Sequence, residues 1–183
     1  ATTVRLVDCR WWGTTPPPAW WSRLDGSGGQ VLEQATHLLD VVRLLAGEVD
    51  EVSGAAAASS RTGRDVPDAT AAVLRFESGA VGTATTSCVL PVPVAAGVDV
   101  AADGLAVTLT ETGLRLRTPD GDERTAPAVD ARLAVDRAFV DLLQGAAPAA
   151  GLVDVAEALR THRLAAAVTE AAHRGTTVRV AGR

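Results

Sequence analysis

The spacing of hydrophobic residues changes along the chain and predicts both strands and helices. Residues 2–10 alternate between apolar and polar positions, as in a half-buried β-strand. Residues 30–46 place apolar side chains three and four positions apart, which is typical of an amphipathic helix. After a long segment rich in β-branched residues, helical spacing returns at 130–144 and 154–174, and a last strand is expected at 176–180.

The segment between residues 48 and 118 predicts a meander of short strands. The expected strands are 48–58, 70–77, 80–90, 94–102, 105–110 and 114–117. Glycines that follow polar residues predict tight turns at 78–79, 103–104 and 112–113, and a further turn is expected at 119–122. Because strands joined by tight turns run antiparallel, we expect an α+β domain with an open, mainly antiparallel sheet and helices packed on one face.

A long loop is predicted at residues 13–29, between the first strand and the first helix. Pro16 to Pro18 exclude regular structure, and the loop ends in the glycine-rich segment 26–29. Glycines before a helix can hold a phosphate, but the chain has no lysine for a Walker A loop. A dinucleotide fingerprint would also follow a strand directly. A tight turn with close packing is the simpler interpretation.

Composition restricts the classes of protein that this chain can belong to. The 183 residues suit one domain or two very small ones. The formal net charge is −5, so we expect no binding to nucleic acid. Cys9 and Cys88 match no zinc motif and are two thiols or one disulfide. No membrane span or signal segment is recognisable, so we expect a cytoplasmic location. Methionine is absent, so we expect a part of a longer protein.

Glu33, His37 and Asp40 follow one another at helical spacing and are the main candidates for chemistry. One helical turn separates His37 from each carboxylate, so the three side chains can share one face. A carboxylate beside histidine raises its pKa and orients its ring, as general acid–base catalysis requires. The alternative is an exposed helix face with ordinary ion pairing. A metal site is less well supported, because no third ligand and no HExxH pattern is present.

Four of the six aromatic residues are tryptophans within eleven residues of one another: Trp11, Trp12, Trp20 and Trp21. Trp11 or Trp21 is expected to pack in a core. Trp12 or Trp20 is expected to line a pocket beside the His37 helix, where an indole can stack on the apolar face of a sugar or polyol.

Three segments resemble the glucose–fructose oxidoreductase / inositol dehydrogenase / MocA-like family (GFO/IDH/MocA). The first runs from Gly28 through Glu33, His37 and Asp40 to Val49, and the second is the hairpin 72–82 with its Phe and Ser-Gly turn. The third is the last helix with Gly175 and the strand Val178-Arg179-Val180. Members of the family have an N-terminal Rossmann domain that binds NAD or NADP and a C-terminal α/β domain. This chain, residues 1–183, is similar to the second domain alone.

The resemblance implies roles for individual residues. His37 occupies the position of the family's catalytic histidine, and Asp40 would lie near the substrate or nicotinamide side of the cleft. Glu33 stands where inositol dehydrogenase-like members have an aspartate that assists catalysis. The family's catalytic lysine belongs to the N-terminal domain, which also binds the cofactor and determines the choice between NAD and NADP.

We therefore expect the substrate-binding and dimerising half of an NAD(P)-dependent oxidoreductase that acts on a sugar, polyol or related hydroxy compound. This chain alone is expected to be inactive and to form a homo-oligomer through the open face of its sheet. The alternative is a non-catalytic ligand-binding or dimerisation module that has kept the fold.

Overall fold

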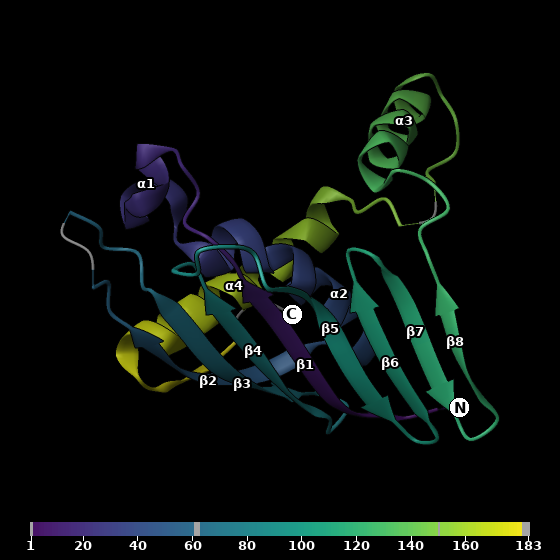
Figure 1. Ribbon diagram of the computed structural model, residues 1–183, viewed down its shortest axis with the longest axis horizontal. Coiled ribbons are helices and arrows are strands. Elements are labelled where there is room, and N and C mark those ends of the chain that lie inside the picture. Colours follow the sequence, from purple (N-terminus) through teal and green to yellow (C-terminus); the bar gives the residue numbers. More distant parts are fainter. Residues whose placement is uncertain (1, 61–62, 150, 181–183) are drawn as a thin grey trace.

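A computed structural model describes residues 2–60, 63–149 and 151–180, which form one nine-stranded sheet with helices (Figure 1). The strands are β1 (Val4–Trp12), β2 (Val49–Ala57), β3 (Ala69–Phe76), β4 (Val81–Ser87), β5 (Ala95–Ala102), β6 (Leu105–Thr110), β7 (Gly113–Thr118), β8 (Gly121–Thr125) and β9 (Thr177–Arg179). The helical elements are η1 (Ala19–Ser22), α1 (Leu24–Ser27), η2 (Val31–Ala35), α2 (Thr36–Ala46), α3 (Ala131–Leu143) and α4 (Val155–Arg174).

The sheet has the strand order β8-β7-β6-β5-β1-β4-β3-β2-β9, and its pairs are antiparallel except for β1 with β4. The predicted α+β class with an open, mainly antiparallel sheet is confirmed. The parallel pair arises because β1 lies between two consecutive strands of the meander, where Cys9 pairs with Ala84 on one side and Val98 on the other. Figure 1 shows β1 in the middle of the sheet.

Strand β8 is not among the strands predicted from the sequence. Its residues Gly121–Thr125 are all exposed and mostly charged, so they lack the apolar–polar alternation by which a strand is recognised. The expected turn at 119–122 is shorter, because Asp122 pairs with Arg117 in the ladder and also forms an ion pair with Arg115.

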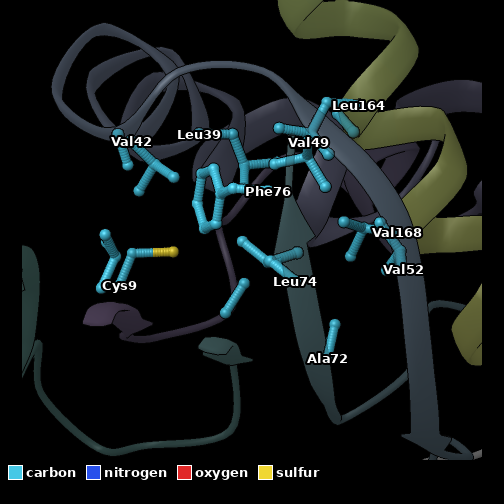
Figure 2. Close-up of a cluster of buried hydrophobic side chains, with 14 of the residues drawn as sticks. Cys9, Leu39, Val42, Val49, Val52, Ala72, Leu74, Phe76, Leu164 and Val168 are labelled. Atoms are coloured by element: carbon cyan, nitrogen blue, oxygen red, sulfur yellow. The ribbon is translucent and has the colours of Figure 1, made fainter. Parts of the chain in front are cut away.

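The core lies between one face of the sheet and the helices α2 and α4. Figure 2 shows Leu39 of α2, Leu74 and Phe76 of β3, and Leu164 of α4 in one cluster of buried side chains. Strand β1 contributes Val7 and Cys9 to the same side, whereas Leu6 and Trp12 face away from it. Leu39 has no exposed surface, so its truncation to alanine is expected to cost about 2–5 kcal/mol.

Helix α3 does not cover the sheet. Its N-cap Asp130 accepts hydrogen bonds from the backbone N–H groups of Arg132 and Leu133, at 2.9 and 3.3 Å. None of its residues is buried, and it stands apart from α2 and α4 in Figure 1. Apolar spacing correctly predicts this helix, but it does not reveal what the apolar face packs against.

Both cysteines are free and buried, so the alternative of a disulfide between Cys9 and Cys88 is excluded. Burial raises the pKa of the Cys9 thiol to about 12. Within the described ranges, no helix is sufficiently long and apolar to cross a membrane.

Candidate functional site

A groove of about 940 Å³ lies between α2, the ends of β1, β5 and β6, and helix α3. Its walls are mainly apolar, with a few polar groups among them. The lining residues are Trp11, His37, Leu38, Val41, Ala96, Gly97, Leu109, Thr110, Glu111, Ala131, Arg132, Val135 and Asp136. An apolar groove with a small number of polar groups is the usual form of a small-molecule site.

Trp11 and His37 lie side by side in the lining of this groove. Their ring centroids are 6.3 Å apart, and the ring planes are inclined by 40°. Trp11 lies on the helix-covered side because it continues the inward positions Val7 and Cys9 of β1. His37, near the start of α2, is exposed, so its imidazole is accessible to a ligand in the groove.

Glu33 lies in a π-helical turn, η2, which leads directly into α2. Such turns occur frequently at functional sites. Oε2 of Glu33 accepts a 2.7 Å hydrogen bond from Nε1 of the fully buried Trp21. Trp21 packs with Val66 and Cys88 in a second, smaller core, as expected for one of the tryptophans. Among the described residues, no side-chain hydrogen bond or ion pair joins Glu33 to His37.

Asp40 is directed toward α4. Its Oδ1 accepts a 2.5 Å hydrogen bond from the hydroxyl of Thr161 and lies 3.8 Å from Nη1 of Arg43. Asp40 is not among the residues that line the groove. The three candidate side chains therefore diverge: His37 faces the groove, Glu33 contacts Trp21 and Asp40 contacts α4.

The two tryptophans expected beside His37 lie elsewhere. Trp12 is on the opposite face of the sheet from Trp11, where its Nε1 donates a 3.0 Å hydrogen bond to Thr85 Oγ1. There it borders a shallow apolar depression of about 590 Å³ formed with alanines of β2 and β3. Trp20 lies in η1 and is 54% exposed. Neither lines the groove, so a role in substrate binding stays a prediction for both.

The groove also contains polar residues that sequence reasoning missed. Thr110 and Glu111 come from the β6–β7 turn, and Arg132 and Asp136 come from the first turns of α3. They are about 70 to 100 residues away from His37, and no local pattern links them to it. Trp11 could have been found, because strand alternation places it on the same face as Val7 and Cys9.

The glycine-rich loop is a tight turn. The backbone N–H groups of Gly28 and Gly29 already donate, at 2.8 Å to the Leu24 carbonyl and at 3.0 Å to Ser27 Oγ. A Cβ at Gly28 would lie 2.8 Å from Cδ1 of Leu32, and its φ of 71° also favours glycine. The loop therefore serves close packing before η2, and these N–H groups are not free to bind a phosphate.

No group of three or more His, Cys, Asp or Glu side chains in the described part of the chain is arranged to hold a metal ion.

Solved structures share this fold across nearly the whole chain. A levoglucosan dehydrogenase in complex with NADH matches with a TM-score of 0.82 and 15% identity, over 99% of this chain and 59% of that one. The WlbA dehydrogenase from Bordetella pertussis, in complex with NADH and UDP-GlcNAcA, matches with a TM-score of 0.78 and 19% identity, over 99% and 56%. The fold is thus that of one part of larger dehydrogenases.

The model of the GFO/IDH/MocA C-terminal domain matches residues 2–104, more than half of the chain. The chain therefore belongs to this family, and the resemblance noted in the sequence is confirmed. An uncharacterised protein of Schizosaccharomyces pombe, UNK4.17, is 29% identical over 180 residues, which cover 83% of this chain and 44% of that protein. The chain thus spans less than half the length of this relative.

Proposed function

We propose that this chain is the substrate-binding half of an NAD(P)-dependent oxidoreductase that acts on a sugar, a polyol or a related hydroxy compound. The observation that carries the proposal is the exposed imidazole of His37 beside the indole of Trp11, in an apolar groove of about 940 Å³. His37 takes or returns the proton of a substrate hydroxyl, and Trp11 offers a flat surface to the apolar face of the substrate.

The substrate class is supported by the mixture of groups in the groove. Leu38 and Val41 of α2 continue the apolar wall, while Thr110, Glu111 and Arg132, from the end of β6, the turn after it and α3, provide a hydroxyl, a carboxylate and a guanidinium. A sugar or polyol has both kinds of surface. A levoglucosan dehydrogenase with this fold was solved with NADH and levoglucosan, with a TM-score of 0.81 and 16% identity over 97% of this chain and 59% of that one.

The cofactor in this proposal is NAD or NADP, held mainly by an N-terminal Rossmann domain. In the described residues the N–H groups of Gly28 and Gly29 are engaged within the chain, which supports binding of the dinucleotide phosphates outside this loop. When bound, the nicotinamide supplies the hydride acceptor or donor. The uncovered apolar side chains of α3, including Leu133 and Phe139, suit a packing partner such as this domain. This chain alone would bind the dinucleotide weakly and would not turn over.

The other candidate residues have different roles in the proposal. Glu33, which accepts a hydrogen bond from Trp21, holds the π-helical turn in place and affects proton transfer at His37 without a direct hydrogen bond to it. Asp40 orients a substrate hydroxyl only if its bond to Thr161 is exchanged for one to the substrate. Trp12 and Trp20 do not line the groove, so they contact the substrate only if it extends beyond the groove.

The open face of the sheet is proposed to contact a second copy of the chain. Leu6, Val73 and Val81 are about half exposed on this face, and Trp12 lies at its end. An apolar surface of this kind needs a cover, and a two-fold related copy is a simple one. On the same face of the sheet Arg10 forms an ion pair with Asp99. This polar pair restricts how two copies can meet.

The decisive experiment is the His37→Ala substitution in the longer protein that contains this chain. A lost general acid or base lowers kcat/KM by about 10²–10⁴-fold. His173→Ala, an exposed histidine on α4, is the matched control and should keep the wild-type rate. Wild-type kcat/KM in the His37→Ala enzyme would refute the assignment.

A non-catalytic ligand-binding module is the second candidate. One observation favours it: within the described residues, the carboxylates of Glu33 and Asp40 form no hydrogen bond or ion pair with His37, and both have other partners. Calorimetric binding of a sugar or polyol to the longer protein, without reduction of NAD or NADP, would support this alternative.

A further inference from the structure

Arg43 is a buried cation at the junction of α2 and α4. Its side chain is only 3% exposed. Nε and Nη2 donate hydrogen bonds to the two carboxylate oxygens of Glu48, at 3.0 and 2.6 Å. Nη2 also donates to Glu157 Oε1 at 2.7 Å, and Nη1 donates to Thr161 Oγ1 at 2.7 Å and to the Glu157 carbonyl at 3.3 Å.

This network joins three segments of the chain. Arg43 and Asp40 come from α2, Glu48 comes from the residues that follow α2, and Glu157 and Thr161 come from α4. The hydroxyl of Thr161 links Arg43 to Asp40, because it accepts a hydrogen bond from Arg43 and donates one of 2.5 Å to Asp40. Removing a guanidinium from water is unfavourable, and here two carboxylates and two further acceptors compensate it.

The apolar contacts between α2 and α4 restrain the rotation of α2 less directionally than hydrogen bonds do. The buried face of α4 is made largely of small residues: Thr161, Leu164, Ala165, Ala167, Val168, Ala171 and Ala172. Burial of apolar surface is not directional, whereas hydrogen bonds from a planar guanidinium to both oxygens of one carboxylate are. The Arg43 network therefore adds a directional restraint on the rotation of α2 to the apolar packing of Leu39 and Val42 in the core.

His37 and Arg43 lie on different sides of the same helix. They are six residues apart, which corresponds to about 9 Å along the axis and about 240° around it. Because α2 is continuous from Thr36 to Ala46, a rotation at Arg43 is transmitted to His37. A rotation of about 20° would move the imidazole by roughly 2 Å, and displacements of about 1 Å can lower a catalytic rate about 100-fold.

We propose that Arg43 is a positioning residue: its network with Glu48, Glu157 and Thr161 holds α2 in the rotation that keeps His37 against Trp11. Asp40 belongs to this network through Thr161. The catalytic consequence rests on the proposed function, whereas the structural consequence can be measured in this chain without a substrate.

The first test measures the ring signals of His37 by NMR in this 183-residue chain. The Trp11 ring, 6.3 Å away, shifts the imidazole proton resonances of His37, which are assigned by comparison with His37→Gln. Arg43→Met should move or broaden the His37 signals and leave those of His173 unchanged. Arg174→Met, which removes an exposed ion pair at the other end of α4, is the control and should change neither.

A milder variant covers the case in which Arg43→Met does not fold. Thr161→Val keeps the volume of the side chain and the carboxylate partners of Arg43 but removes the links to Arg43 Nη1 and Asp40. It should shift the His37 signals in the same direction by a smaller amount. If both variants fold and the His37 signals are unchanged in both, the proposal is overturned. If Arg43→Met does not fold, unchanged His37 signals in Thr161→Val alone overturn it.

The second test uses kinetics of the longer protein. Arg43→Met should lower kcat about tenfold or more with little change in KM, and Arg43→Lys, which keeps the charge, should recover part of the loss. A normal kcat in Arg43→Met would overturn the catalytic consequence. If His37→Ala retained the wild-type rate, the proposed function would fail, but the NMR result on Arg43 would stand independently.

Discussion

The indole N–H of Trp21, a side chain with no exposed surface, donates a 2.7 Å hydrogen bond to the carboxylate of Glu33. This bond connects the smaller core of the loop region to the π-helical turn that begins the His37 helix. Hydrogen bonds to a charged partner are stronger than those between neutral groups. This hydrogen bond therefore joins the loop region to the helix that carries His37, and its contribution to the free energy of unfolding can be measured.

We predict energetic coupling between these two residues. A double-mutant cycle with Trp21→Phe and Glu33→Ala should give an interaction energy of about 1.5 to 3 kcal/mol in urea unfolding. Trp20→Phe is the matched control, since Trp20 is largely exposed and should show no coupling to Glu33→Ala. Additive effects of Trp21→Phe and Glu33→Ala would show that the bond contributes nothing to stability.

Trp11 and Trp12 should have separable roles, because they lie on opposite faces of β1. In the proposed two-domain oxidoreductase, Trp11→Ala should raise KM for the substrate roughly tenfold, since it removes about 1.4 kcal/mol of stacking and burial. Trp12→Ala, which does not alter the groove, should change KM less than Trp11→Ala does and should weaken self-association, which sedimentation velocity measures. An increase of KM in Trp12→Ala alone would place the substrate on the other face of the sheet.

The buried thiol of Cys9 predicts a loss of stability at alkaline pH. Burial raises its pKa from 9.0 to about 12, so the unfolded chain releases this proton more readily than the folded one. The free energy of unfolding is therefore unaffected by Cys9 below about pH 9 and falls as the pH rises toward 12, by up to about 1.4 kcal/mol per unit.

This pH dependence can be isolated because the chain contains no lysine and no tyrosine. Urea unfolding at pH 8 and pH 10.5 should show a smaller loss for Cys9→Ala than for the wild type. Burial raises the pKa of Cys88 as well, against the opposing effect of Arg64, so Cys88→Ala should remove a further part. Equal losses in all three proteins would contradict the prediction.

Helix α3 should contribute little to the stability of this chain. None of its side chains is buried, and a 13-residue helix without tertiary packing is marginal in water. Phe139→Ser should change the free energy of unfolding by less than about 0.5 kcal/mol, whereas Leu39→Ala should cost about 2–5 kcal/mol. Rapid amide hydrogen exchange throughout α3 is expected, and strong protection there would disprove this interpretation.

Local patterns allow most of the secondary structure to be predicted. The helix at 30–46 and the meander strands are recognisable because three- to four-residue and two-residue spacings are set by neighbours in the sequence. The structure confirms them within a few residues. The exposed strand β8 and the π-helical turn carry no such signal, and the central position of β1 depends on pairings with residues far along the chain.

The side-chain contacts of the candidate site are less predictable, because they too join residues that are far apart in the sequence. His37 could be singled out from its spacing and its resemblance to a family, and it does face a groove. Asp40, however, is directed to Thr161, a residue 121 positions further on, and no helical pattern contains that information. Glu33 likewise shares a stripe with His37 in the sequence, but its carboxylate is held by Trp21.

The insertion of β1 between β4 and β5 has a consequence for folding kinetics. The two halves of the sheet, β2–β4 with β9 and β5–β8, are bridged only by β1 in the strand order of the described residues. Strands β2–β4 and β5–β8 can each form from neighbouring hairpins, whereas β9 reaches β2 from 124 to 128 positions away. Joining the two halves requires β1 to pair with residues 75 to 98 positions away. Such a late, long-range step makes folding slow, and the exposed strand edges of β4 and β5 are the surfaces at which newly synthesised chains would aggregate before β1 arrives.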